Sequence, residues 1–177
     1  MNDKQQIRNL INRAKKDLTP DQREVLSASL LQKLESHPLF KNAKTVLLYY
    51  SLPDEVQTHN FIEKWYGQKR IILPIVIDPE LELREYRGTV FLKESSFHIF
   101  EPVGVAFTDY ASIDLALIPG IGFDNLGNRL GRGKGYYDKL LHRLESYNIY
   151  KIGICFDCQK INRIPTDSYD IPMNEVL

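Results

Sequence analysis

Apolar residues form two patterns that alternate along this chain. Some short stretches are almost continuously apolar, which is typical of strands buried on both faces of a sheet. Other stretches carry apolar residues at every third or fourth position, as on the buried face of an amphipathic helix. The predicted buried strands are residues 44–50, 70–77, 112–118 and 150–156, and a weaker alternation at 81–86 predicts an edge strand.

The helical pattern precedes the first strand and recurs between the later ones. Its clearest start signal is Thr19, an N-cap residue followed by Pro20 at the first helical position and by Gln22, which completes a capping box. The predicted helices are residues 3–17, 20–36, 58–66 and 136–147.

Buried strands that alternate with helices predict an α/β fold with a mostly parallel sheet covered on both faces. At 177 residues the chain is long enough to bury roughly 70% of its unfolded surface. We therefore expect one domain spanning residues 1–177. The polar tail from Ile164 is expected to be a loop that folds back onto this domain.

Charge and hydropathy exclude several function classes. The formal net charge is +0, so no long-range field favours nucleic acid or an anionic membrane, and any anion site must be local. The strongest apolar runs, 46–50 and 71–77, are too short to span a bilayer. The N-terminus has no apolar core of a secretory signal. We expect a cytoplasmic monomer with small-molecule partners.

The two cysteines form a Cys-x-x-Cys motif, Cys155 and Cys158. A redox pair of this spacing favours a helix N-terminus, and a structural zinc site needs a second pair of ligands. Cys155 instead ends a strand-like run, and the four histidines are scattered. Buried, reduced thiols are the preferred interpretation.

The most informative segment is 119–138, PGIGFDNLGNRLGRGKGYYD. It lies between a predicted strand and a predicted helix, and it combines glycines with cations. Glycine allows a ligand to approach the backbone, and the helix adds the positive end of its dipole. This combination predicts a phosphate-binding loop, although it matches neither the Walker A nor the dinucleotide spacing. A solvated surface loop is the alternative. The residues concerned are Gly127, Arg129, Gly131, Arg132, Gly133, Lys134 and Gly135.

Residues 114–141, DLALIPGIGFDNLGNRLGRGKGYYDKLL, closely resemble the signature of the 5-formyltetrahydrofolate cyclo-ligase family, also called methenyltetrahydrofolate synthetases. The resemblance extends over nearly the whole chain through weaker blocks in the family's order. These blocks are KQQIR at 4–8, YSLPDEVQT at 50–58, ILP at 72–74, EP at 101–102 and YDIPMNEV at 169–176.

The resemblance implies a three-layer αβα fold related to ribose-5-phosphate isomerase and CoA transferases. It also implies an enzyme that uses ATP and Mg²⁺ to convert 5-formyltetrahydrofolate into 5,10-methenyltetrahydrofolate, with release of ADP and phosphate. The alternatives are a non-catalytic family member that binds folate or nucleotide, and an isomerase or CoA-transferase relative that needs no ATP. Fold alone does not separate these classes.

By the same resemblance, the glycine segment and the first helix contact ATP. Arg132 and Lys134 are expected to bind the phosphates, and both are expected to be catalytic together with Tyr136. Arg129 has an alternative role as an ion-pair partner of Asp124, and Lys4 and Arg8 have one as a solvated helix face. The residues assigned to ATP are Lys4, Arg8, Arg129, Leu130, Gly131, Arg132, Gly133, Lys134, Gly135, Tyr136 and Tyr137.

The folate contacts implied by the resemblance centre on Glu55, which matches an acid facing the pterin. Tyr50 is a candidate wall of the folate site, with a core position as its alternative, and Tyr137 is expected to belong to the core through its helical phase. The residues assigned to the substrate are Tyr50, Glu55, Arg132, Gly133, Lys134, Gly135 and Tyr136.

Two aspartates match the family's magnesium-linked positions, Asp138 and Asp170. Their alternatives are a helix-dipole partner for Asp138 and a turn residue for Asp170. One position departs from the family pattern. Many members have a basic residue after the proline of the second strand, where this chain has Ile75, so an anion contact there is not expected.

Overall fold

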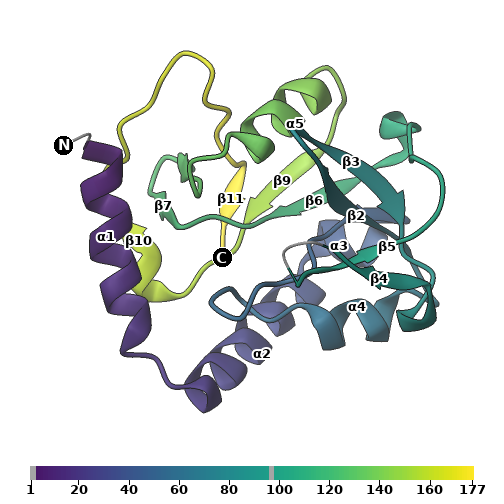
Figure 1. Cartoon of the computed structure of the whole chain (residues 1–177), viewed down its shortest axis with the longest axis horizontal. Helices are drawn as coiled ribbons and strands as arrows, with labels where there is room; N and C mark the ends of the chain where they lie inside the picture. Colours follow the sequence, from purple (N-terminus) through teal and green to yellow (C-terminus); the bar gives the residue numbers. More distant parts are fainter. Residues whose placement is uncertain (1–2, 96–97) are drawn as a thin grey trace.

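A six-stranded sheet crosses the middle of the molecule in the computed structural model, which describes residues 3–95 and 98–177 (Figure 1). All neighbouring strands pair in parallel except β3, which is antiparallel to β2 at one edge. In spatial order the strands are β11 (Glu175–Val176), β9 (Tyr150–Gly153), β6 (Leu115–Ile118), β1 (Thr45–Leu47), β2 (Arg70–Ile77) and β3 (Glu80–Glu85).

Helices cover both faces of this sheet. Alternate residues along β1 enter different apolar clusters, with Val46 joining Leu34 of the second helix and Leu47 joining Leu140 of the last one. Helices α2, α3 and α4 contribute to the first cluster, and α5 contributes to the second. The helices are α1 (Asp3–Lys16), α2 (Pro20–Ser36), α3 (Pro38–Asn42), α4 (His59–Trp65) and α5 (Tyr136–Leu144).

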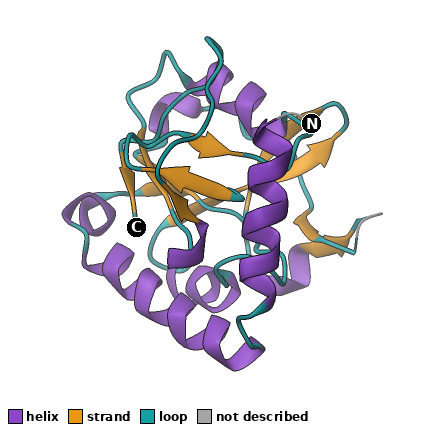
Figure 2. Cartoon of the chain, turned by 90° about the vertical axis from the view of Figure 1, so that its left-hand side faces the viewer, coloured by secondary structure: helices purple, strands orange, loops and turns teal. Residues whose placement is uncertain are grey.

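Helix α1 stands apart from these layers and packs on a small three-stranded sheet (Figure 2). That sheet consists of β10 (Lys160–Ile161), β7 (Gly122–Asp124) and β8 (Arg129–Leu130). A Cβ at Gly122 would lie 2.6 Å from the Ile11 side chain, so the absence of a side chain there lets α1 approach. Helix α1 is thereby held against the segment that contains the glycine loop, residues 131–135.

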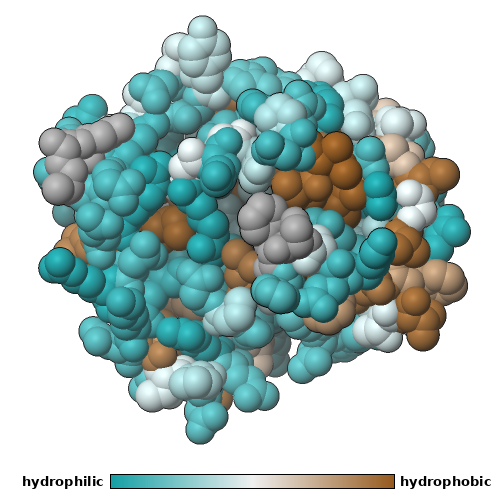
Figure 3. Space-filling model, in the orientation of Figure 1, coloured by the Kyte–Doolittle hydropathy of each residue, from teal (hydrophilic) through white to brown (hydrophobic). Residues whose placement is uncertain are grey.

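A two-stranded hairpin, β4 (Leu92–Glu94) and β5 (Phe100–Pro102), lies beside the edge of the main sheet. The Val76 amide donates to Glu101 Oε1 at 2.9 Å, which ties the hairpin to β2. Figure 3 shows apolar surface on the side where Figure 1 places this hairpin. The exposed apolar residues in and around it are Val90, Phe91, Phe100, Val103 and Val105.

The predicted α/β fold with a mostly parallel sheet and helices on both faces is confirmed. So is the capping box at Thr19, which accepts from the Gln22 amide. The relation to ribose-5-phosphate isomerase and CoA transferases stays a prediction. The unity of the domain also stays a prediction, and residues 1, 2, 96 and 97 of its expected span lie outside the described residues.

The main differences concern short elements. Strands β1 and β9 are shorter than predicted, because the chain leaves the sheet to form the loops at their carboxyl ends, whereas β6 starts later than predicted, because Tyr110–Ser112 form a short 3-10 helix. The tail is a loop from Ile164 but ends in β11, which joins the main sheet. Both cysteines are free thiols, and burial raises the pKa of Cys155 to about 12. No helix in the described part of the chain has the length and apolar character to cross a membrane.

Candidate active site

A cavity of about 420 Å³ opens at the carboxyl ends of the central parallel strands. Tyr49 and Tyr50 follow β1, Pro119 and Gly120 follow β6, and the hairpin residue Phe100 closes one side. Ligands of open α/β sheets bind at this edge. The expected site residues that line the cavity are Tyr50, Glu55, Arg129, Gly131, Arg132, Lys134, Gly135, Tyr136, Tyr137 and Asp138.

The glycine loop connects β8 to α5 along the rim of this cavity. Gly133 (φ +105°) and Gly135 (φ +72°) adopt backbone conformations that favour glycine. Within the described residues, the amide N–H groups of 131–138 donate to no other protein group. Free amides at a helix N-terminus, beside the exposed Arg132 and Lys134, form an anion-binding surface.

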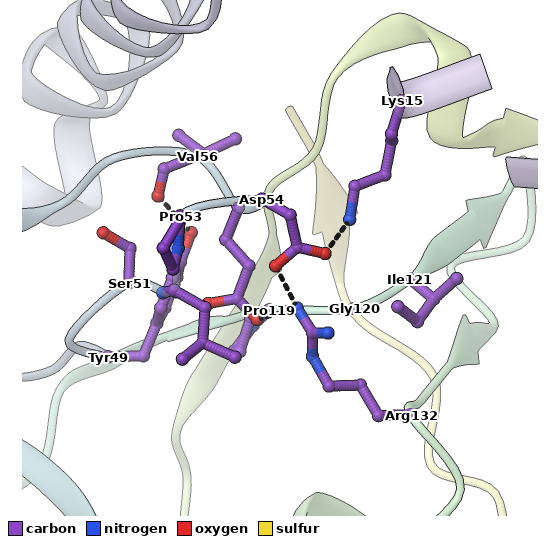
Figure 4. Close-up of polar contacts among 12 residues, drawn as sticks. Lys15, Tyr49, Ser51, Pro53, Asp54, Val56, Pro119, Gly120, Ile121 and Arg132 are labelled. Carbon is purple, nitrogen blue, oxygen red and sulfur yellow. Dashed lines mark hydrogen bonds and ion pairs between the residues drawn. The ribbon is translucent and has the colours of Figure 1, made fainter. Parts of the chain in front are cut away.

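Arg132 is held by two acids of the block that follows β1. Its Nη2 donates to Asp54 Oδ1 at 2.7 Å and to Glu55 Oε1 at 2.9 Å. Asp54 Oδ2 in turn accepts from Nζ of Lys15 at 2.6 Å (Figure 4). Burial raises the pKa of Asp54, but the hydrogen bonds from Arg132 and Lys15 outweigh burial and leave it below its usual range. Asp54 is therefore a carboxylate at neutral pH.

Arg129 packs against the glycine loop and the start of α5. Its side chain is only 5% exposed, its Nη2 contacts Asp138 Oδ1 at 2.5 Å, and its guanidinium lies 5.5 Å from the Tyr137 ring centroid. A Cβ at Gly131 would lie 3.1 Å from Nη1 of Arg129. The suggested pairing of Arg129 with Asp124 is wrong, because Arg129 points toward the start of α5.

Asp124 instead organises the preceding turn. Its carboxylate accepts from the amides of Leu126, Asn128 and Ile164 and from the Asn128 side chain. Burial raises the pKa of Asp124, but these four hydrogen bonds outweigh burial and lower it below its usual value. The buried carboxylate thus joins β7, the turn before β8 and the start of the tail.

Asp124→Asn should destabilise the protein by about 2 kcal/mol at pH 7, because an amide replaces a charged acceptor among donors. A depressed folded-state pKa stabilises the fold above the unfolded pKa of about 3.9, and this contribution is lost as pH falls through the folded value. Urea unfolding should therefore separate the variant from wild type at pH 7 and bring them closer below about pH 4. A gap independent of pH would contradict this role for the charge.

Lys4 and Arg8 lie on α1 beside the loop and the tail, outside the cavity lining. Arg8 Nε donates to the carbonyl oxygen of Gly131 at 2.8 Å. Lys4 Nζ contacts Asp167 Oδ2 at 2.8 Å and Asp170 Oδ2 at 3.1 Å. The two residues therefore contact the glycine loop and the tail, and a purely solvated helix face, their alternative, does not describe them.

Aromatic side chains form much of the remaining wall. Tyr50 stacks on His59 with ring centroids 3.8 Å apart, and His59 Nε2 lies 2.9 Å from the Ser51 carbonyl oxygen, to which it donates. The Tyr136 hydroxyl donates to Asp78 Oδ1 at 2.8 Å. Tyr137 is partly buried against the core cluster, as its helical phase predicted, and also lines the cavity. Burial is the main cause that raises the pKa of Tyr137.

The two aspartates expected to bind metal occupy different surroundings. Asp138 lines the cavity and pairs with Arg129 through Oδ1 alone. Asp170 lies in the tail, where its Oδ2 accepts from Lys4 and from the Asp167 amide. The described residues contain no cluster of three or more His, Cys, Asp or Glu side chains that could hold a metal ion.

Sequence reasoning missed several residues of the site. Lys15 continues the Ile7 and Ile11 stripe at i, i+4 spacing, so a lysine on the apolar face of a helix was an available signal. Asp54 precedes Glu55 in the 50–58 block, where the resemblance assigns a role only to Glu55. Phe100 belongs to a strand too short for a periodic pattern, and no motif in the adjacent sequence indicates that it lines a cavity.

A mostly parallel sheet with a substrate-sized cavity at its carboxyl edge, and a basic glycine loop on the rim, is typical of an α/β enzyme with a small-molecule site. The family model for the 5-formyltetrahydrofolate cyclo-ligase family matches residues 1–177. The chain belongs to the 5-formyltetrahydrofolate cyclo-ligase family, so the enzyme class expected from the sequence is confirmed.

Individual relatives agree over nearly the full length. The chain is 29% identical over 180 residues to a 5-formyltetrahydrofolate cyclo-ligase of Haemophilus influenzae, covering 98% of this chain and 96% of the relative. A Mus musculus cyclo-ligase is 32% identical over 173 residues, covering 90% of this chain and 85% of the relative. The solved Aquifex aeolicus 5,10-methenyltetrahydrofolate synthetase is 33% identical with a TM-score of 0.85, covering 98% of this chain and 88% of that one.

Proposed function

We propose that this protein cyclises 5-formyltetrahydrofolate to 5,10-methenyltetrahydrofolate at the cavity described above, and that it consumes ATP. The observation that carries this proposal is the composition of the cavity lining. Residues of the glycine loop 131–135 and of the Tyr50–Glu55 block line the same cavity, and Arg132 contacts Glu55 directly. A site that transfers a phosphoryl group to folate needs both surfaces within reach of each other.

The glycine loop is suited to the triphosphate. Arg132 and Lys134 supply positive charge, and the amides of 131–138 are free to donate to phosphate oxygens. Phosphoryl transfer relies mainly on positioning and on stabilising charge, and these groups provide both. Arg8 holds the Gly131 carbonyl and Arg129 lies beneath the same residue, so their support of ATP is through the loop backbone.

The other side of the cavity is suited to the pterin. Tyr50 presents a ring fixed by stacking on His59, and a flat heterocycle packs well against such a face. Glu55 Oε2 accepts from the Leu52 amide at 2.9 Å, which fixes the carboxylate while its oxygens still have room for a second donor. Glu55 would accept hydrogen bonds from the donor edge of the pterin.

The reaction then has two steps. The formyl oxygen attacks the γ-phosphorus of ATP, and the bond from that phosphorus to the bridging oxygen breaks. ADP leaves, and the phosphoryl group stays on the formyl oxygen of folate as an imidate phosphate. The neighbouring anilino nitrogen attacks the formyl carbon and gives up its proton to water, and the C–O bond breaks to release phosphate and close the ring. Arg132 and Lys134 would offset the charge that develops in the first step.

Mg²⁺ belongs to this proposal as well. Asp138 lines the cavity, and its Oδ2 has no hydrogen-bond partner among the described residues. One such carboxylate, completed by phosphate oxygens and water, is what Mg²⁺ usually accepts. Asp138 would hold the ion, which when bound neutralises phosphate charge. Asp170 lies outside the cavity lining, and its Oδ2 is engaged by Lys4 and by the Asp167 amide, so Asp138 is the first candidate ligand.

The direct test is absorbance at the methenyl-folate band after mixing the protein with 5-formyltetrahydrofolate, ATP and Mg²⁺. We expect growth of the band that requires all three components. Heat-denatured protein and 10-formyltetrahydrofolate serve as controls for spontaneous cyclisation. Tight folate binding without growth of the band or consumption of ATP would overturn the proposal in favour of a binding protein.

A further inference from the structure

Asp54 connects a buried lysine to the exposed arginine of the glycine loop. Lys15, from α1, has a side chain only 4% exposed, and its Nζ donates to Asp54 Oδ2 at 2.6 Å. The other carboxylate oxygen accepts from Arg132 at 2.7 Å (Figure 4). Because Lys15 is enclosed, it fixes the carboxylate from the protein side. The carboxylate in turn fixes the guanidinium from the cavity side.

Arg132 uses only one of its three guanidinium nitrogens to contact the protein. Nη2 makes both contacts, to Asp54 and to Glu55, while Nη1 and Nε donate to no protein group within the described residues. The side chain remains 42% exposed. A guanidinium binds phosphate best through two parallel N–H donors. Both such pairs include Nη2, because the Nε–H points to the side of Nη2 and not of Nη1. Nε and Nη1 are therefore left as single donors for phosphate oxygens, and the contacts of Nη2 set their directions.

We propose that Asp54 is a positioning residue for Arg132, anchored by Lys15, and that it orients the free Nε and Nη1 donors of the guanidinium toward the phosphates of ATP. The inference rests on the proposed function, because it takes ATP as the anion. Without the Asp54 charge, Arg132 keeps Glu55 as its anionic partner and loses the contact that Lys15 anchors. Neither Lys15 nor Asp54 needs to touch a substrate.

A structural tie between α1 and the 50–58 block is the competing explanation. The single variant Asp54→Asn does not separate the two, because it also leaves Lys15 buried without a charged partner, which is destabilising. The double variant Lys15→Met/Asp54→Asn does. It replaces the buried cation by an apolar side chain of similar length, so the fold recovers while the anchor of Arg132 stays neutral.

The experiment measures the Kd for ATP by calorimetry without folate, together with KM values in turnover and melting temperatures. We expect Asp54→Asn to melt at least about 5 °C lower and to bind ATP about tenfold more weakly, as for loss of a charge-assisted hydrogen bond. The double variant should recover most of the melting temperature and keep the tenfold rise in both Kd and KM for ATP. Its KM for 5-formyltetrahydrofolate should stay within about threefold of the wild-type value, because neither substituted residue donates a hydrogen bond to folate.

The matched control is Glu35→Gln/Lys64→Met, which removes another lysine–carboxylate pair, between α2 and α4, outside the cavity lining. It should bind ATP as wild type does. Wild-type ATP affinity in Lys15→Met/Asp54→Asn would overturn the inference and leave only the structural tie. A wild-type protein that binds ATP but does not cyclise folate would overturn the proposed function alone, since the Kd ratio still tests Asp54.

Discussion

Lys134→Ala is expected to lower kcat/KM by about 100- to 1,000-fold, the usual cost of removing a group that stabilises charge in the transition state. The side chain is exposed on the glycine loop and lines the cavity. It forms no hydrogen bond or ion pair within the described residues, so nothing in the fold depends on it. The melting temperature should therefore stay unchanged while turnover falls.

Arg132→Ala should show a loss of similar size in the same assay, since the two cations flank Gly133 on one loop. Lys33→Ala, on the exposed side of α2, is the matched control and should keep full activity. Progress curves at saturating and limiting ATP separate the effect on kcat from the effect on KM. Near-normal turnover in both Lys134→Ala and Arg132→Ala would mean that the loop does not act on the phosphates.

Gly127→Ala is expected to destabilise the fold by about 3 kcal/mol, from backbone strain and overlap together. Gly127 has φ +80°, and a Cβ there would overlap the carbonyl oxygen of Met173 in the tail. The same two residues share a backbone hydrogen bond of 2.8 Å from the Met173 amide to the Gly127 carbonyl, so neither segment can simply move away. For a chain of this size the melting temperature should fall by roughly 6–12 °C.

Two other glycines divide this effect into its parts. Gly135 has φ +72° with open space where a Cβ would lie, so Gly135→Ala should cost only the dihedral strain, about 1 kcal/mol. Gly67 has neither feature, and Gly67→Ala should stay within about 0.5 kcal/mol of wild type. Differential scanning calorimetry of the three variants gives the order, and equal stability of all three would refute the overlap.

The sequence carried enough information for the core of the fold because each layer has its own pattern. β2 was predicted with its observed bounds, since all of 70–77 is apolar or flanks apolar residues. Thr19 and Pro20 defined the start of α2 by local chemistry alone. By contrast β8 has two residues, and no periodicity can be read from two positions. Such strands exist because the surrounding sheet and α1 hold them.

The residues of the candidate site also fall into those that local sequence predicts and those that only the fold brings together. The glycine loop was predicted because its chemistry is continuous in sequence, and Glu55 because it lies in a recognisable block. The contact of Arg132 with Asp54 joins residues 78 positions apart, and that of Lys15 with Asp54 joins residues 39 apart. Neither pairing leaves a trace in local composition, so only the folded chain reveals which acid meets which cation.

The docking of α1 on the glycine loop also bears on how the protein is made. Arg8 finds its partner, Gly131, 123 residues later in the chain. At about 5–20 residues per second, a ribosome needs roughly 6–25 s to cover that distance. For most of this time Ile7 and Ile11 lack the residues that later cover them, since these begin at Ile121. The apolar face of the first helix is thus covered only late in synthesis, after most of the sheet has been made.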